Sequence, residues 1–250
     1  MPAPAVVLGS QLIAGVAAVG VALLRAETFP SPADLALSAG AGAATAIALA
    51  AFYRGLATAR VGVVAPVAAV LGAGVPVFVG IALAGVPGAL QLAGMAMGLV
   101  GVGLVSRSRD DNSDRPSGLL IALLAGVAFG AFFVFLGLLE GDAVFWPLAI
   151  ARLTAVASIG AVARVRRTQA LPPRRSLPLV AGIGLLDTLG MAGYVLATQI
   201  ARLDEAAIIS SMYPVVTIVL AALIFRERIG RVQALGISLA MAAIVLIGAG

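Results

Sequence analysis

Residues 61–84 read VGVVAPVAAVLGAGVPVFVGIALA, a run of 24 residues without a charged side chain. About 20 apolar residues suffice for a helix to cross the hydrocarbon core of a bilayer. The whole chain is similar in character, with 62% hydrophobic residues, 11% charged residues and a mean hydropathy of +1.13. A soluble domain has about 25% charged residues. The sequence therefore predicts an all-α integral membrane protein with nine apolar segments: 4–24, 34–56, 61–84, 88–105, 118–139, 143–163, 177–200, 205–225 and 231–249.

The charged residues lie mainly between these segments, and all sixteen basic residues are arginine. Basic loops beside apolar spans are typical of membrane topology, so we expect a lipid bilayer, and no nucleic acid, as partner. Histidine and cysteine are absent, which excludes a His or Cys metal site and a cysteine nucleophile. No G-x-x-x-x-G-K-[ST] loop for ATP is present either. We therefore expect no cofactor and no enzymatic activity.

An internal repeat appears when the chain is shifted by 142 residues. The matching pairs are Arg25 with Arg167, Arg60 with Arg202, Gln91 with Gln233, Gly94 with Gly236, and Leu104 with Leu246. The shift relates segments one to four to segments six to nine and leaves segment 118–139 without a partner. The repeated unit would thus have five helices, and an odd number inverts the second copy in the membrane. Such inverted repeats are frequent in transporters, with the substrate site between the copies.

The domain organisation follows from this repeat. Residues 1–105 form a first repeat of four helices, and residues 118–250 form a second repeat of five. The hydrophilic stretch 106–117, within SRSRDDNSDRPSG, joins the two repeats.

The second repeat carries recognisable motifs. Residues 193–220 read GYVLATQIARLDEAAIISSMYPVVTIVL, followed by Phe225-Arg-Glu-Arg228 and Gln233-Ala-Leu-Gly236. This stretch resembles the EamA domain of the drug/metabolite transporter superfamily. The first repeat resembles it more loosely, because Gly72 and Gly85 stand where the pattern has a proline and a glutamate. The resemblance implies a ten-helix fold that moves small metabolites. Segment 4–24 corresponds to the second helix of that fold, so a truncated start and a true nine-helix variant are both open.

Two charged residues lie inside predicted spans, Arg152 and Asp187. A charge at mid-bilayer is costly, so it should face a partner or a cavity. Antiparallel helices would bring both residues to a similar depth, which predicts that they pair. A structural ion pair and a role in substrate binding or proton coupling both remain open. Arg152 also matches an arginine common in EamA helices, where the first repeat has Ser10 and Gln11.

Further polar residues are predicted to line a cavity with this pair. Pro214 would interrupt a helix and free a backbone carbonyl, and hydroxyl and amide groups flank it. The predicted wall consists of Tyr194, Gln199, Ser210, Ser211, Tyr213 and Pro214. Phe145 and Trp146 are instead predicted to anchor a helix at the membrane interface.

These observations predict a secondary active transporter in the cell (inner) membrane. Its substrate would be a small polar metabolite, such as an amino acid, exported by alternating access with protons as the expected coupling ion. The alternatives are a broad multidrug exporter, a membrane-embedded lipid-modifying enzyme and a non-transporting scaffold. The sequence leaves open whether the chain is a monomer or a homodimer. Thirteen arginines near span ends lie on one side and only Arg25 and Arg202 on the other, which predicts a cytoplasmic N-terminus and an external C-terminus. The ten-helix members of the family that the chain resembles instead keep both ends in the cytoplasm, which would place the arginine-rich linkers outside.

Overall fold

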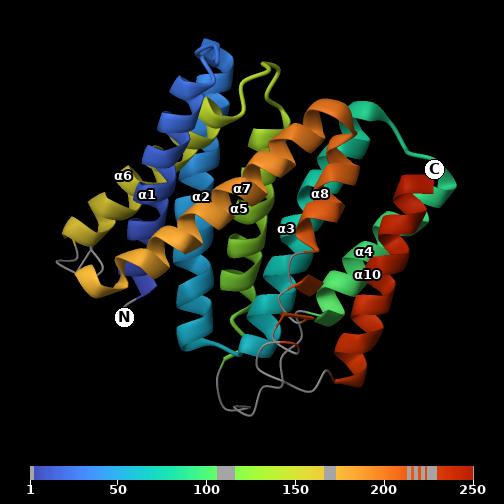
Figure 1. Ribbon diagram of the computed structural model, residues 1–250. Coiled ribbons are helices and arrows are strands. Elements are labelled where there is room, and N and C mark those ends of the chain that lie inside the picture. Colours follow the sequence, from blue (N-terminus) through green and yellow to red (C-terminus); the bar gives the residue numbers. More distant parts are fainter. Residues whose placement is uncertain are drawn as a thin grey trace. The chain divides into compact units, whose positions relative to one another are not determined.

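The computed structural model describes residues 3–105, 116–165, 173–212, 215–216, 219–220, 223 and 230–249. Over these residues every regular element is a helix (Figure 1), which confirms the predicted all-α fold. The α-helices are α1 (Ala3–Leu24), α2 (Pro32–Thr58), α3 (Val61–Ala84), α4 (Ala89–Val105), α5 (Leu119–Gly137), α6 (Phe145–Val165), α7 (Leu177–Ile200), α8 (Leu203–Ser211) and α10 (Arg231–Ala249). A short 3-10 helix, η1 (Arg174–Ser176), precedes α7.

Most of these helices match the predicted membrane spans. Among the described helices, seven are long and apolar enough to cross a bilayer: α1, α2, α3, α5, α6, α7 and α10. Helix α4 has 17 residues and is shorter than these seven. Helix α8 has 9 residues, and much of the predicted segment 205–225 lies outside the described residues.

The chain divides into two compact units, and each unit takes segments from both halves of the sequence. Unit 1 contains Met1–Ile47 and Phe135–Ile200, and unit 2 contains Ala48–Val134 and Ala201–Gly250. The packing units are therefore different from the two sequence repeats. That the two sequence repeats are related copies stays a proposal. Contacts between related segments within one unit provide evidence for it.

Unit 1 is built on helix α1, which packs against both α6 and α7. Two glycines make these approaches close. A methyl group added at Gly15 would lie 3.2 Å from Cβ of Arg152, and one at Gly184 would lie 2.5 Å from the carbonyl oxygen of Ser10. Since real Cβ contacts are longer, only glycine allows α7 to approach the backbone of α1 at Gly184.

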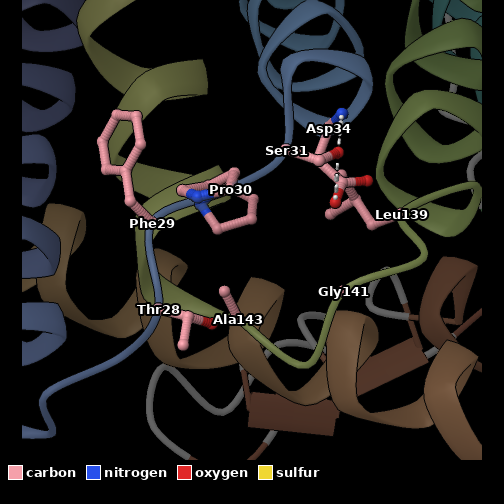
Figure 2. A pocket seen from close by; sticks show the side chains of 9 residues that line it. Thr28, Phe29, Pro30, Ser31, Asp34, Leu139, Gly141 and Ala143 are labelled. Carbon is pink, nitrogen blue, oxygen red and sulfur yellow. Dashed lines mark hydrogen bonds between the residues drawn. The ribbon is translucent and has the colours of Figure 1, made fainter.

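One end of unit 1 is closed by two loops, one between α1 and α2 and the other between α5 and α6. A cavity of about 140 Å³ lies between them and is lined by Phe29, Asp34 and Pro147 among others. Figure 2 shows Asp34 and Ser31 at its edge, joined by a hydrogen bond. The backbone N–H of Glu140 donates to Oδ1 of Asp34 at 3.1 Å. Asp34 therefore holds the α5–α6 loop against the start of α2.

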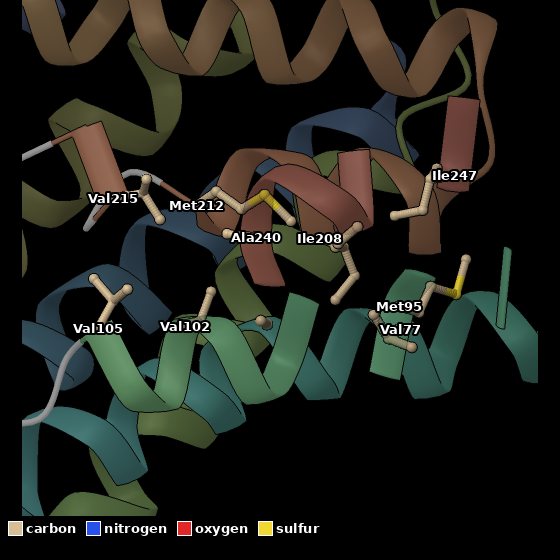
Figure 3. Close-up of a cluster of buried hydrophobic side chains, with 11 residues drawn as sticks. Val77, Met95, Val102, Val105, Ile208, Met212, Val215, Ala240 and Ile247 are labelled. Atoms are coloured by element: carbon tan, nitrogen blue, oxygen red, sulfur yellow. The ribbon is translucent and has the colours of Figure 1, made fainter. Parts of the chain in front are cut away.

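Unit 2 contains an apolar core of buried side chains (Figure 3). Side chains from α3, α4, α8 and α10 meet in this core, which includes Val77, Met95, Ile208 and Ile247. These helices are apolar because lipid surrounds their outer faces, and small residues let them pack closely.

The contact between α4 and α10 is reciprocal. A methyl group added at Gly94 would lie 3.1 Å from the carbonyl oxygen of Ala243, and one at Gly236 would lie 2.9 Å from that of Gly101. The 142-residue shift converts Gly94 into Gly236 and Gly101 into Ala243. The two contacts are thus one contact repeated with the helices exchanged, and the helices run antiparallel. This arrangement supports the proposed inverted repeat.

The same shift relates the starts of these two helices. Oε1 of Gln91 accepts a hydrogen bond from the N–H of Gly88, and Oε1 of Gln233 accepts one from the N–H of Gly230, each at 3.0 Å. The first N–H groups of a helix have no partner within it. Each glutamine therefore satisfies a free donor at the start of its own helix.

Candidate functional site

The central polar feature of unit 1 is an ion pair between α6 and α7. Nη1 of Arg152 lies 2.6 Å from Oδ2 of Asp187, so the predicted pair is present. Its two side chains differ in exposure, at 6% for Arg152 and 44% for Asp187. Arg152 is thus a buried cation whose partner can be reached from outside unit 1.

A third polar residue joins this pair from α1. Nη1 of Arg152 also donates to Oε1 of Gln11 at 2.9 Å, and Gln11 itself is buried. From the sequence alone, Ser10 and Gln11 are only the first-repeat counterparts of Arg152. In the structure, Ser10 turns its hydroxyl to the carbonyl of Val7, whereas Gln11 reaches Arg152. We call Arg152, Asp187 and Gln11 the polar triad.

The rest of the Arg152 guanidinium is less well satisfied. Nη2 is buried and has no hydrogen-bond acceptor among the residues that the structure describes. A buried donor without an acceptor loses its hydration without compensation. Nη2 is therefore a buried donor that an acceptor on a ligand would satisfy.

The predicted wall residues of α7 lie at different distances from the triad. Tyr194 follows Asp187 by two helical turns, or roughly 10 Å, and is almost fully buried. Gln199 follows Asp187 by twelve residues, or roughly 18 Å, and its Nε2 donates to the carbonyl of Gly141 at 3.4 Å. Gln199 therefore lies near the loop end of unit 1 and does not join the triad.

The other predicted wall residues belong to a different part of the chain. Ser210 and Ser211 lie on α8 in unit 2. Ser211 is buried, and its hydroxyl donates to the carbonyl of Ile208 at 2.8 Å. Tyr213 and Pro214 fall outside the described residues. A single wall formed by all of these residues thus stays a prediction.

The loop end of unit 1 carries an acidic residue that the sequence analysis missed. Oε2 of Glu27 accepts hydrogen bonds from the N–H groups of Phe145 and Trp146, at 2.9 and 3.3 Å. A carboxylate at a helix N-terminus is favoured by the free donors and by the helix dipole. The indole Nε1 of Trp146 donates to the carbonyl of Glu27, and its ring meets Phe29 edge to face. Trp146 thus fixes the loop as well as the start of α6.

Unit 2 has its own ionic network at the start of α8. Arg202 donates to both carboxylate oxygens of Asp204, at 3.1 and 2.8 Å, and to the carbonyls of Ala84 and Gly85. The Asp204 side chain is fully buried. The hydrogen bond to Asp204 raises the pKa of Arg202, so this arginine stays charged at physiological pH. The network fastens the end of α3 to the start of α8.

Comparison with known proteins identifies the family. The EamA-like transporter family matches residues 116–249, more than half of the chain. The chain belongs to this family. Its fold is also similar to that of a protein of known crystal structure, with a TM-score of 0.74, 17% identity, and coverage of 99% of this chain and 88% of that one. A search of curated proteins finds no match.

Membership of the EamA-like family confirms the resemblance predicted from residues 193–236. It makes the chain a multi-pass membrane transporter of the drug/metabolite transporter superfamily, whose partners are a small-molecule substrate and the lipid bilayer. Within the described part of this EamA-like chain, no group of three His, Cys, Asp or Glu residues could hold a metal ion. The polar triad is therefore the candidate site of unit 1.

Proposed function

We propose that this EamA-like chain is a secondary transporter that exports small polar metabolites, such as amino acids, across the cytoplasmic membrane by alternating access. The observation that carries the proposal is the polar triad. Arg152 lies seven residues into the 21-residue helix α6, and Asp187 lies ten residues into the 24-residue helix α7. At about 1.5 Å per residue, both lie roughly 10–15 Å from the start of their helices, deep within the span.

A charged group at such a depth is expensive. An arginine or aspartate at the centre of a spanning helix costs about 2.5–3.5 kcal/mol or more on insertion. An apolar helix pair would hold the fold at least as well as a buried ion pair. The cost is thus best explained by contact with a polar solute during transport.

The composition favours small polar solutes over large planar cations. Aromatic residues make up 5% of the chain, and few flat surfaces are therefore available for stacking on a drug-like ring. The chain has no nucleotide-binding loop, so we propose that gradients of solute and protons drive the movement.

Transport by reconstituted protein tests the proposal. Purified protein in liposomes is loaded with a panel of amino acids and other small metabolites, and efflux is followed with and without a pH gradient. We expect efflux of a subset of the panel above the rate of protein-free liposomes. Rates equal to those of protein-free liposomes for the whole panel would contradict the proposal.

Cysteine labelling tests the site. The native chain has no cysteine, so single cysteines at Asp187 and Ser210, neither of which is buried, can be labelled without background. We expect a water-soluble thiol reagent to reach them more than a cysteine at exposed Leu186 on α7, and we expect the transported solute to slow the labelling. Labelling no faster than at Leu186, and unaffected by solute, would argue against this site.

A further inference from the structure

The hydrogen bond and the ion pair of Arg152 divide its guanidinium into two halves. Nη1 makes both of the contacts described for the triad, with Gln11 and Asp187. Nη2 is buried and finds no acceptor among the described residues. A carboxylate matches the planar fork of arginine with two parallel hydrogen bonds. The geometry thus suits a ligand carboxylate that pairs with Nη2 and replaces Asp187 on Nη1.

Asp187 is the residue that such a ligand would displace. Its closest approach to Arg152 is the 2.6 Å contact between Oδ2 and Nη1, and 44% of its side chain is exposed. Its contact with Arg152 is therefore open to exchange. Gln11, in contrast, is neutral and buried, so it can keep its bond to Nη1 while the anionic partner changes.

The surrounding charges decide what must follow this exchange. Helix α1 carries no ionisable side chain in its described length, and α6 carries Arg152 and Arg164. Helix α7 carries Asp187 and Tyr194, and η1 before it contains Arg174 and Arg175. Arg164 and the η1 arginines lie twelve or more residues from the triad along their helices, or roughly 18 Å away. Among the described residues of these helices, none is thus close enough to neutralise a second carboxylate beside Asp187.

We infer that Arg152 exchanges its partner, binding the carboxylate of a small organic acid while Asp187 takes up one proton. The proton comes from water, or from the acid itself if the acid arrives protonated, and forms an O–H bond on Asp187. The triad carries no net charge before binding, and the loaded site carries none either. A neutral site is the least costly in a low-dielectric surrounding. The chain would therefore move a carboxylate and a proton together.

This inference rests on the proposed function and specifies its substrate class and coupling. Joint movement of a carboxylate and a proton is electroneutral, so the membrane potential does not drive it. Export is then driven by the combined concentration gradients of the carboxylate and the proton.

Proton uptake on binding provides the test. Purified full-length protein in weakly buffered detergent solution is mixed with acetate, lactate, benzoate or glutarate, and with lactamide, which has no carboxylate, for comparison. Binding is followed by calorimetry and proton uptake by a pH-indicator dye. We expect at least one of the acids to bind with uptake of about one proton per site. Binding of an acid without proton uptake would overturn the inference, and so would binding of lactamide alone.

Variants separate this mechanism from other sources of protons. Asp187→Asn should still bind the acid but take up almost no proton, and Arg152→Gln should bind it at least tenfold more weakly. Asp142→Asn, at an exposed loop carboxylate of unit 1, should behave as the native protein does. Unchanged proton uptake in Asp187→Asn overturns the inference. If Asp187→Asn folds poorly, the measurement of proton uptake by the native protein still tests the inference. If other solutes cross liposomes without proton uptake, the inference fails while the proposed function stands. If no solute binds or crosses, both fail.

Discussion

Arg152 and Asp187 are joined by a contact of 2.6 Å, yet one side chain is 6% exposed and the other 44%. The asymmetry means that the cation is fixed by its surroundings and the anion is accessible. Gln11 adds a neutral acceptor to the fixed partner. We propose that this accessible carboxylate lets the pair act in transport as well as join α6 to α7.

The role of Gln11 can be measured by removing its amide. Gln11→Leu leaves Nη1 of Arg152 with one acceptor fewer in an apolar surrounding. We expect the free energy of unfolding to fall by about 1–2 kcal/mol. Denaturation in mixed micelles measures the change, and Ser10→Ala is the matched control, because Ser10 bonds only within its own helix in the described contacts. Equal stability of Gln11→Leu and Ser10→Ala would show that the bond to Arg152 contributes nothing.

Two glycines of α7 provide a matched pair for the packing in unit 1. A methyl group at Gly184 would lie 2.5 Å from the carbonyl oxygen of Ser10, whereas one at Gly182 would meet nothing within 4 Å. Gly184→Ala should therefore destabilise the protein by about 1–3 kcal/mol through overpacking. Gly182→Ala should be neutral or slightly stabilising, since alanine favours helix. Thermal unfolding of the two variants measures the difference, and a smaller loss at Gly184 than at Gly182 would contradict the packing.

The reciprocal contact in unit 2 predicts a pattern of disulfide cross-links. Two pairs of cysteines should cross-link on mild oxidation, because each pair lies at a helix contact. One pair replaces both Gly94 and Ala243, and the other replaces both Gly101 and Gly236. In a third pair, cysteines replace both Gly101 and Ala243. Ala243 lies seven residues, or roughly 10 Å, along α10 from Gly236, which is the residue that Gly101 contacts. This third pair should remain reduced, because a disulfide requires Cα atoms within about 7 Å. Proteolysis between α4 and α10 and gel electrophoresis report the result, and cross-linking of the third pair alone would refute the antiparallel contact.

Arg202 and Asp204 should be strongly coupled in stability. Arg202→Gln leaves the fully buried carboxylate of Asp204 without its cation, which we expect to cost about 3 kcal/mol. Adding Asp204→Asn removes the unpaired charge, so the double variant should be more stable than Arg202→Gln alone. Unfolding of the two single variants and the double variant completes a double-mutant cycle. Additive effects would mean that the network does not stabilise the start of α8.

Much of the fold could be predicted from the sequence because lipid imposes a simple length requirement. The apolar run 61–84 is a helix over the same residues, since backbone groups in hydrocarbon must be satisfied within one helix. The pair of Arg152 and Asp187 was predictable for a related reason, because each charge inside a span requires a partner.

Other features could not be predicted, because they depend on how helices cross. The 142-residue shift aligns Ser10 with Arg152, so the two residues occupy equivalent positions in the two repeats and no contact between them is expected. Helix α1 instead packs on its related helix α6, and so a neighbour of Ser10 touches Arg152. The hydrogen bonds from Arg202 to the carbonyls of Ala84 and Gly85 could not be predicted either. Every residue has a backbone carbonyl, so the residue types do not show which carbonyl accepts a bond. The hydrogen bond from the N–H of Asp34 to Oγ of Ser31, by contrast, is the N-cap contact that a serine just before a helix favours.

Exchange of solute across liposomes tests the central claim that the polar triad is a transport site. Liposomes containing the native protein, Arg152→Gln or Asp142→Asn are preloaded with an unlabelled solute found to be transported, and entry of the labelled solute is timed. We predict rapid exchange by the native protein and by Asp142→Asn, and a loss of at least tenfold by Arg152→Gln at equal protein content and folding. Exchange by Arg152→Gln at the native rate would contradict the claim.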